Sequence, residues 1–285
     1  TPEIAVDLDD LIMAARALGW TEATEKGTPA HDFLLQYHSD AWNEDLIGLD
    51  VDQIAQLAHD LWDWGRAIPA DERQVRVRNV GSRTLVEAIG PDMPFIINSA
   101  LGECAAQECS VLALFHPIVG GDDGHKQSMV QLHLERVADI QHETLRLGIV
   151  GTLDDVALTV ADFDAMRARM LEAAGAVMSA PRASPEDRQE ARAFLNWLAD
   201  GSFTFLGSRI YTFARNAEGG LANEEPDIIV ESGLGILRDP ERAVLRRGSE
   251  PSVLTPAIQS FLEVPTPLIV AKSNMRSRVH RRTYA

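Results

Sequence analysis

Residues that could support chemistry are scattered along the chain, and their spacing matches no catalytic or cofactor motif. Gly233-Leu234-Gly235 is the one Gly-x-Gly segment, and Arg238 stands where a dinucleotide-binding fingerprint needs its third glycine. His125, His133 and His142 lie eight and nine residues apart, whereas metal sites use i, i+4 or short-loop spacing. We therefore expect no catalytic residue, no NAD site and no metal site within this chain.

Nucleophilic residues show no better pattern. The sequence has no Gly-x-Ser-x-Gly elbow, and neither Cys104 nor Cys109 has an evident histidine partner. Cys104 falls on the apolar face of a predicted helix and Cys109 opens a predicted strand, so both are typical of small buried hydrophobic residues. Two such cysteines form no disulfide framework, and we expect the reducing environment of the cytoplasm.

The chain is organised around a turn, residues 90–99, that joins a short apolar strand at residues 85–89 to an amphipathic helix. The apolar stripe of this helix has i, i+3, i+4 and i+7 spacing, at Ile97, Ala100, Leu101 and Cys104. Asp92 is predicted to cap the helix, because its carboxylate can accept from free amides of the first turn. Pro94 suits the same turn, where its missing N–H would have no intrahelical partner.

Further strands and a second helix follow in an order that predicts a fold. Two strands are expected at residues 109–115 and 129–135, a helix at about 139–153, and a fourth strand where Val156, Leu158 and Val160 alternate. The resulting order is βαββαβ, in which two helices cover one face of a four-stranded antiparallel sheet.

Two glycines interrupt the predicted second helix. Gly148 and Gly151 are three residues apart, and each costs about 1 kcal/mol against alanine inside a helix. They could expose amides to a phosphate, allow close helix packing, or mark an early helix end. We favour packing or fraying, since no phosphate-binding residues accompany them.

Segments on either side of the sheet complete the predicted organisation. Residues 1–73 form a helical lead-in, in which Asp50 and Gln53 have the spacing of a capping box. Residues 74–162 form the sheet domain, which a strand at residues 74–78 extends. Residues 163–183 are a linker helix, and residues 184–285 a mixed α+β domain that opens with Ser184 and Pro185 as a helix start.

Composition excludes some partners. The formal net charge of -17 would repel nucleic acid and anionic membranes. No apolar run approaches 18 residues, so we expect no membrane span. Hydrophobic and charged contents of 45% and 24% are those of a soluble globular protein.

The strand and helix order, with Asp-x-Pro-Phe at the first helix, resembles an ACT domain, a small-molecule-sensing module of amino-acid enzymes. Six segments in register are together similar to the N-terminal region of the large bacterial NAD-specific glutamate dehydrogenases, from about residue 30 onward. They are Asp92-Met93-Pro94-Phe95, His116-Pro117, Ala191 to Asp200, Phe203 to Gly207, Gly233 to Asp239, and Lys272-Ser273-Asn274 with Ser277 to Arg281. The second domain resembles the PAS-like part of this family, and we expect it to be incomplete here, because the family's sheet continues past Val279-His280-Arg281.

The resemblance also implies a ligand position. ACT domains commonly bind an amino acid at the mouth of the first strand and helix, which here means near Asp92, Met93, Pro94, Phe95 and Asn98. Amides at a helix N-terminus would receive the carboxylate, and Asp92 or Asn98 would hold the ammonium group. Against this, Asp92 is already predicted as the cap, and Phe95 is bulky where many ACT domains have glycine.

The function implied is the noncatalytic, regulatory and oligomer-building N-terminal region of an NAD-dependent glutamate dehydrogenase. The family's reaction converts glutamate to 2-oxoglutarate, ammonia and NADH, with NAD and the catalytic domain in a region downstream. Two roles stay open, a scaffold of a homo-oligomer without a ligand or an amino-acid sensor that controls activity. A third reading, an independent enzyme, has no motif in its favour.

Overall fold

The computed structural model describes residues 6–40, 48–120, 124–222, 224–242, 259–260 and 262–270. They divide into two compact units, residues 1–154 and 155–285. Both units contain helices and strands, so the predicted α+β class is confirmed. Among these described residues, no helix is long and apolar enough to cross a membrane.

Three α-helices precede the sheet of the first unit and confirm the predicted helical lead-in. They are α1 (Leu8–Ala17), α2 (Pro29–Asp40) and α3 (Val51–Arg66). The capping box of α3 is present: the Asp50 carboxylate accepts from the backbone N–H of Gln53, whose side chain accepts from the backbone N–H of Asp50. This arrangement satisfies two of the free amides at the helix start.

Five strands form one sheet in the first unit, and each pairing is antiparallel. They are β1 (Gln74–Val80), β2 (Arg83–Pro91), β3 (Val111–Phe115), β4 (Ile118–Gly120) and β5 (Lys126–Glu135). The order is β1-β2-β5-β3, and β4 pairs with the first residues of β5. The predicted strand at residues 74–78 therefore does extend the sheet, at its edge.

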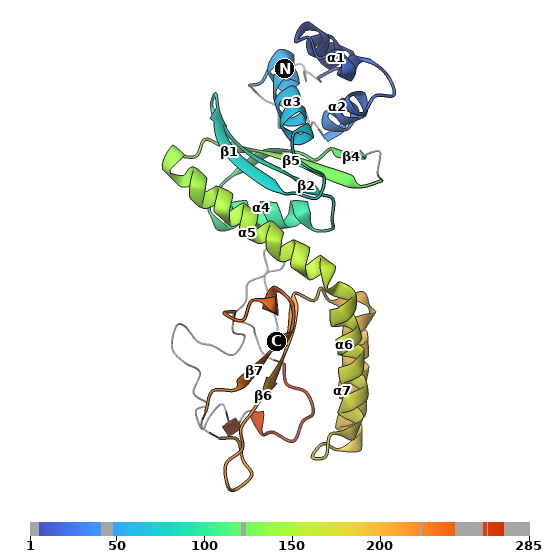
Figure 1. Cartoon of the computed structure of the whole chain (residues 1–285), viewed down its shortest axis with the longest axis vertical. Helices are drawn as coiled ribbons and strands as arrows, with labels where there is room; N and C mark the ends of the chain where they lie inside the picture. Colours follow the sequence, from blue (N-terminus) through green and yellow to red (C-terminus); the bar gives the residue numbers. More distant parts are fainter. Residues whose placement is uncertain are drawn as a thin grey trace, which may run out of the picture. The chain divides into compact units, whose positions relative to one another are not determined.

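Helices cover both faces of this sheet (Figure 1). Helices α1 to α3 lie on one face, where an apolar cluster includes Phe33, Leu61 and Met129. Helices α4 (Ile96–Ala106) and α5 (His142–Ala161) lie on the other, against a second cluster that includes Leu132. Alternate residues of β5 thus enter two different cores, and burial of apolar surface on both faces holds the three layers together.

The predicted fourth strand is wrong. Val156, Leu158 and Val160 belong to the last turns of α5, which continues to Ala161. The physical reason lies in β2, because β1 occupies one of its edges and β5 the other. In a βαββαβ fold the last strand would pair with the edge of β2 that faces away from β5. Here β1, which precedes the βαββαβ segment in sequence, occupies that edge.

The second unit begins with a helix pair. Helices α6 (Phe163–Ala176) and α7 (Pro185–Trp197) pack through Ala174, Ala191 and Leu195. The predicted start of α7 is confirmed, since the Ser184 hydroxyl accepts from the backbone N–H of Asp187. A two-stranded antiparallel sheet, β6 (Gly207–Thr212) and β7 (Asp227–Gly235), follows.

The Gly-x-Gly segment of the second unit forms the end of β7, where Gly235 pairs with Gly207 of β6. Gly235 has φ +57, and a Cβ added there would collide with the carbonyl oxygen of Leu206. Its backbone N–H donates to the buried Asp162 carboxylate at 2.7 Å, and Arg238 donates to the same carboxylate twice at 2.6 Å. The bidentate ion pair of Arg238 and the backbone bond of Gly235 thus connect the end of β7 to Asp162 at the start of α6.

Strand β6 begins at Gly207, where the close approach of Leu237 leaves no room for a Cβ. Its pairing with β7 is irregular between Ser208 and Ile210. Residues 267–270 form no strand. In the part of the chain that the structure describes, short helical turns occur at Glu22–Thr24, Asp139–Gln141, Val177–Ser179, Leu198–Ser202 and Ile236–Arg238.

Candidate functional site

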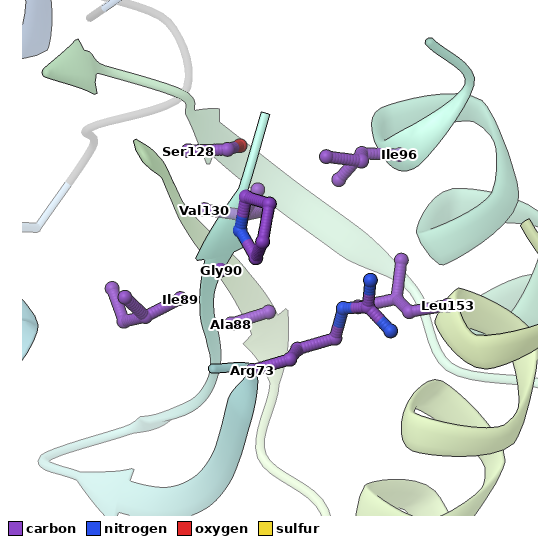
Figure 2. A pocket seen from close by; sticks show the side chains of 9 residues that line it. Arg73, Ala88, Ile89, Gly90, Ile96, Ser128, Val130 and Leu153 are labelled. Atoms are coloured by element: carbon purple, nitrogen blue, oxygen red, sulfur yellow. The ribbon is translucent and has the colours of Figure 1, made fainter. Parts of the chain in front are cut away.

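A small hollow lies where β2 ends and α4 begins, at the place where the sequence predicts a ligand (Figure 2). It has room for roughly one water molecule. Its lining residues are Arg73, Ala88, Ile89, Gly90, Pro91, Ile96, Ser128, Val130 and Leu153. An amino acid does not fit this volume, so a ligand would require the walls to separate.

Arg73 forms the charged wall of the hollow. Its guanidinium donates to the Asp154 carboxylate on α5 at 2.8 Å, and Asp154 is 60% exposed. A Cβ added to Gly90 would lie 3.1 to 3.2 Å from carbon atoms of the Arg73 side chain. Arg73 therefore fills the space next to Gly90 while an exposed carboxylate holds its charged end.

None of the five predicted ligand residues lines this hollow. Asp92, Met93, Pro94 and Phe95 form the turn beside it, where Met93 contacts the Arg73 guanidinium through its sulfur at 3.9 Å. Asn98 is exposed on α4. The hollow thus lies beside the predicted ligand residues but is lined by other side chains, and the ligand position stays a prediction.

The predicted cap is also wrong. Helix α4 begins at Ile96 and its N-cap residue is Phe95, which makes no capping hydrogen bond through its side chain. Phe95 has φ 71, the left-handed conformation that favours glycine. The backbone at this position therefore has the conformation expected of the glycine found in many ACT domains, although the residue is a 43% exposed phenylalanine.

His116 and Ser128 meet at the edge of the hollow. The His116 Nε2 and Ser128 Oγ atoms are 2.5 Å apart, and the backbone N–H of His116 donates to the Asp40 carboxylate at 2.7 Å. Burial lowers the pKa of His116, and the carboxylates of Asp92 and Asp40 only partly oppose this. His116 is therefore neutral near pH 7, and the contact fixes the loop between β3 and β4 to β5.

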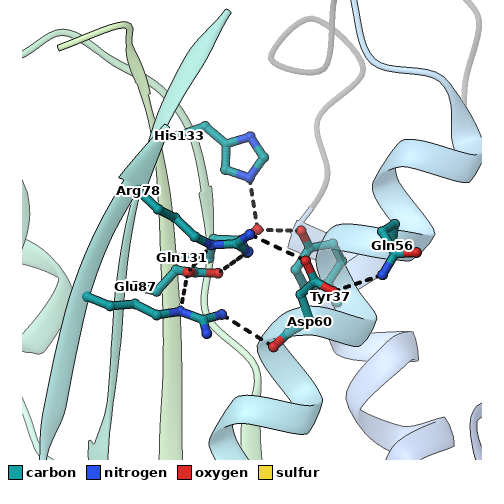
Figure 3. A network of polar contacts seen from close by, with 8 residues as sticks. Tyr37, Gln56, Asp60, Arg78, Glu87, Gln131 and His133 are labelled. Atoms are coloured by element: carbon teal, nitrogen blue, oxygen red, sulfur yellow. Dashed lines mark hydrogen bonds and ion pairs between the residues drawn. The ribbon is translucent and has the colours of Figure 1, made fainter. Parts of the chain in front are cut away.

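A second polar cluster, which the sequence prediction missed, lies between the sheet and the helices α2 and α3 (Figure 3). Its centre is Glu87 on β2, a carboxylate with no exposed surface. Oε2 accepts from Arg76 at 2.6 Å and from Arg78 at 2.9 Å, while Oε1 accepts from Arg78 at 3.1 Å and from Gln131 at 2.8 Å. Burial tends to raise the pKa of Glu87, but these arginine contacts outweigh it and lower the pKa.

The two helices take part in the same cluster. Arg78 donates to the Asp60 carboxylate on α3 at 3.3 Å, and Arg76 donates to the Asp60 carbonyl at 3.3 Å. Arg76 also lies over the Trp64 ring, 4.1 Å from its centroid. From α2, the Tyr37 hydroxyl donates to Gln131 Oε1 at 2.6 Å. Each of these bonds joins the helical layer to the sheet.

The hydrogen-bond directions determine the tautomer of His133. Gln131 Nε2 donates to Glu87, so Oε1 is the atom that accepts from His133 Nε2 at 2.8 Å. His133 Nδ1 then accepts from Arg83 at 3.3 Å. Burial, followed by the charge of Arg83, lowers the pKa of His133 to about 3. The ring is neutral, with both nitrogen atoms in hydrogen bonds, and acts as a structural link rather than as a proton carrier.

The sequence did contain a signal for this cluster. Glu87 is a lone acid within an apolar strand, and Arg76, Glu87 and Gln131 are cross-strand neighbours in the observed register. The alternation of β5 predicts that one face of the strand is exposed to solvent, whereas helices α1 to α3 cover that face in the structure. For metal ions, no group of three or more His, Cys, Asp or Glu residues with ligating geometry occurs in the part of the chain that the structure describes.

Comparisons with known proteins match these features to one family. Residues 33–149 match the family model described as Glutamate dehydrogenase, ACT1 domain. An NAD-specific glutamate dehydrogenase of Pseudomonas aeruginosa is 29% identical over 245 residues, which cover 75% of this chain and 14% of that protein. An NAD-specific glutamate dehydrogenase of Halomonas elongata is 27% identical over 272 residues, 85% of this chain and 16% of that protein.

Residues 33–149 thus match an ACT1 domain of glutamate dehydrogenase, and most of the chain is similar to NAD-specific glutamate dehydrogenases. The ACT1 match begins inside α2 and ends inside α5, so α3 and most of α2 lie within it. The matched segment contains the whole Glu87 cluster and the hollow at β2 and α4 except for Leu153. Leu153 and Asp154, the partner of Arg73, follow its last residue.

Proposed function

We propose that this chain is a noncatalytic regulatory and oligomer-building region of a cytoplasmic NAD-dependent glutamate dehydrogenase. The whole enzyme would convert L-glutamate, NAD and water to 2-oxoglutarate, ammonia and NADH. NAD and glutamate would bind in a downstream catalytic region of the same protein. In this proposal residues 74–162 are the ACT-like domain, after a lead-in at residues 1–73. Residues 163–183 are a linker, and 184–285 are the PAS-like domain.

The observation that carries this proposal is the ACT1 match across a sheet whose two faces are both filled by helices. Its most polar interior cluster, around Glu87, has its charges paired within the domain. Because the curated relatives are about six to seven times longer than the matched segment, there is ample further chain in them for catalysis. A glutamate-and-NAD assay on the 285-residue chain should show no turnover, and robust NADH production would contradict the proposal.

Two surfaces support a role in assembly. Within the described sheet β1 pairs with β2 alone, so its outer edge can accept another strand. Ile140 is 89% exposed just before α5 and Leu147 is 54% exposed on it. Light scattering after size exclusion should show a dimer or larger species, and a monomer at every concentration would contradict the assembly role.

The alternative role is amino-acid sensing at the hollow beside Arg73. Two observations favour it. The Arg73 guanidinium suits a ligand carboxylate, and Gly90 has no side chain that would fill the space next to Arg73. A carboxylate ligand would compete with Asp154 for Arg73 as the walls separate. Calorimetric titration with a panel of amino acids tests this role. A ligand at a hundred times its Kd should add about 2.7 kcal/mol of stability. Absence of both heat and melting shift leaves the assembly role alone.

A further inference from the structure

The C-terminal turn of α4 brings the two cysteines of the chain together. The backbone N–H of Cys109 donates to the Cys104 carbonyl at 2.9 Å, and that of Glu108 donates to the Ala105 carbonyl at 3.2 Å. Glu108 has φ 58, in the left-handed region. These two bonds around one left-handed residue define a Schellman motif, in which the side chains at the Cys104 and Cys109 positions commonly contact each other.

Covalent geometry limits how far apart the two residues can be. With a 2.9 Å hydrogen bond between Cys109 N and Cys104 O, the two Cα atoms are at most about 6.8 Å apart. Disulfides are found at Cα separations of roughly 4.4 to 6.8 Å. The turn therefore keeps the two Cα atoms no farther apart than the upper limit observed for disulfides.

The surroundings of the two thiols differ. Both are free, and both belong to the apolar cluster under α4 and α5, but Cys104 is fully buried whereas Cys109 is partly exposed. Burial, then the nearby Cys109 and Glu103, raises the pKa of Cys104 to about 12. The pKa of Cys109 is also raised by burial. Cys109 is thus the thiol that a solution oxidant reaches first.

We propose that Cys104 and Cys109 form a reversible intramolecular disulfide when the chain meets a small disulfide oxidant such as glutathione disulfide. Cys109, as the thiolate, attacks one sulfur of glutathione disulfide, which gives a mixed disulfide and releases one glutathione. Cys104 then attacks the Cys109 sulfur as its proton passes to the departing glutathione thiolate, which leaves as the second glutathione. Two protein thiols are oxidised to one disulfide, and one glutathione disulfide is reduced to two thiols.

The bond would close the last turn of α4 next to Glu103. Glu103 accepts from Gln107 at 2.8 Å and from Thr152 on α5 at 3.2 Å, so the same turn also contacts the second helix of this layer. A closed turn has fewer unfolded conformations, and the oxidised chain should therefore melt at a higher temperature than the reduced one. This modification goes beyond the proposed regulatory and assembly roles and does not depend on them.

Intact-mass spectrometry of the folded 285-residue chain after incubation with glutathione disulfide tests the proposal. The expected product has lost two hydrogens, and its Cys104 and Cys109 resist alkylation until a reductant is added. No Lys or Arg lies between the two cysteines, so a tryptic digest keeps both on one peptide, where the loss can be located. A chain that stays unmodified, or that stops as a glutathione adduct, overturns the proposal.

Two single variants test the order of the steps. Cys104→Ala should accumulate a stable glutathione adduct on Cys109, because no second thiol can displace it. Cys109→Ser should remain unmodified, because Cys104 is buried. Cys109→Ser replaces a partly exposed residue and is expected to fold. It therefore tests the order of the steps even if Cys104→Ala fails to fold. An adduct on Cys104 in Cys109→Ser would show that the buried thiol reacts directly and would contradict the proposed sequence.

Discussion

Arg76 on β1 and Glu87 on β2 are cross-strand neighbours joined by a 2.6 Å ion pair on the sheet face that α3 covers. Arg76 also reaches the Asp60 carbonyl of α3, so one guanidinium links two strands and a helix. A buried carboxylate is costly unless its oxygens are satisfied, and the four donors around Glu87 meet that condition. The pair is therefore part of what holds the helical layer on the sheet.

Removing the charge of Glu87 should weaken that attachment. In Glu87→Gln the shape is kept, but Arg76 loses its counter-charge and Arg78 retains only that of Asp60, while both arginine side chains remain about two-thirds buried. We expect a loss of about 2–4 kcal/mol in the free energy of unfolding, measured in urea. Glu143→Gln is the control, because Glu143 pairs with Arg146 on the exposed side of α5 and should change stability little. Equal effects of the two variants would contradict a structural role for Glu87.

His133 makes stability depend on pH in a defined window. Its pKa is about 3 in the folded chain and 6.5 when unperturbed, so between these values the unfolded chain binds more protons. Stability should therefore fall as pH decreases below about 6.5, by up to about 1.4 kcal/mol for each pH unit. Urea unfolding at pH 7.5, 6.5 and 5.5 measures this slope. His133→Gln should flatten it, whereas replacing the exposed His125 by glutamine should not.

Glu87 contributes at lower pH than His133. Its pKa is lowered from 4.5 by the two arginines, so its stabilisation is complete above about pH 4.5 and is lost as pH falls through the lowered value. The range from pH 7.5 to 5.5 therefore excludes Glu87, whereas His116, whose pKa burial also lowers, contributes there with the same sign as His133. His133→Gln should therefore reduce the slope in that range, and an unchanged slope would show that His133 does not contribute to it.

Local patterns predicted strands β1, β2, β3 and β5 of the sheet, but they missed β4 and wrongly added a strand at its edge. Alternation over Val156, Leu158 and Val160 covers too few residues to separate a strand from a helix. Val156 and Val160 are also one helical turn apart and continue the row of Leu145, Ile149 and Leu153, which are buried on α5. Only the pairing of β1 with β2, a contact made in three dimensions, decides against the strand.

The ligand position near Asp92 stays a prediction, and the lining of the hollow beside it could not be predicted from local sequence. The turn after β2 could be located from Gly90 and Pro91, yet Arg73 and Ser128 come from other parts of the chain and only the fold brings them there. The Glu87 cluster was missed for a similar reason. The polar face of β5 predicts contact with solvent, and nothing in that strand indicates that Tyr37 and Asp60 will cover it.

The two glycines of α5 should respond in opposite ways to a methyl group. A Cβ at Gly148 would collide with Glu103 and Gln107 on α4, whereas a Cβ at Gly151 meets nothing within 4 Å. Gly148→Ala should therefore separate α4 from α5 and destabilise the chain by about 1–3 kcal/mol. Gly151→Ala should stabilise it by about 0.5–1 kcal/mol, because alanine is the better helix former. Thermal unfolding of both variants distinguishes packing from fraying, since fraying would make the two changes alike.

The left-handed residue at the end of α4 allows a similar comparison of two glycine substitutions. Glu108 is exposed and has φ 58, a conformation that costs a non-glycine residue about 1–2 kcal/mol. Glu108→Gly removes that strain and should raise the free energy of unfolding by about 0.5–1 kcal/mol, after the entropy of the added glycine is subtracted. Ala105→Gly, within the helix and also exposed, should lower it by a similar amount. Urea unfolding of the reduced chain measures both, and a destabilised Glu108→Gly variant would show that the glutamate side chain contributes more than the strain costs.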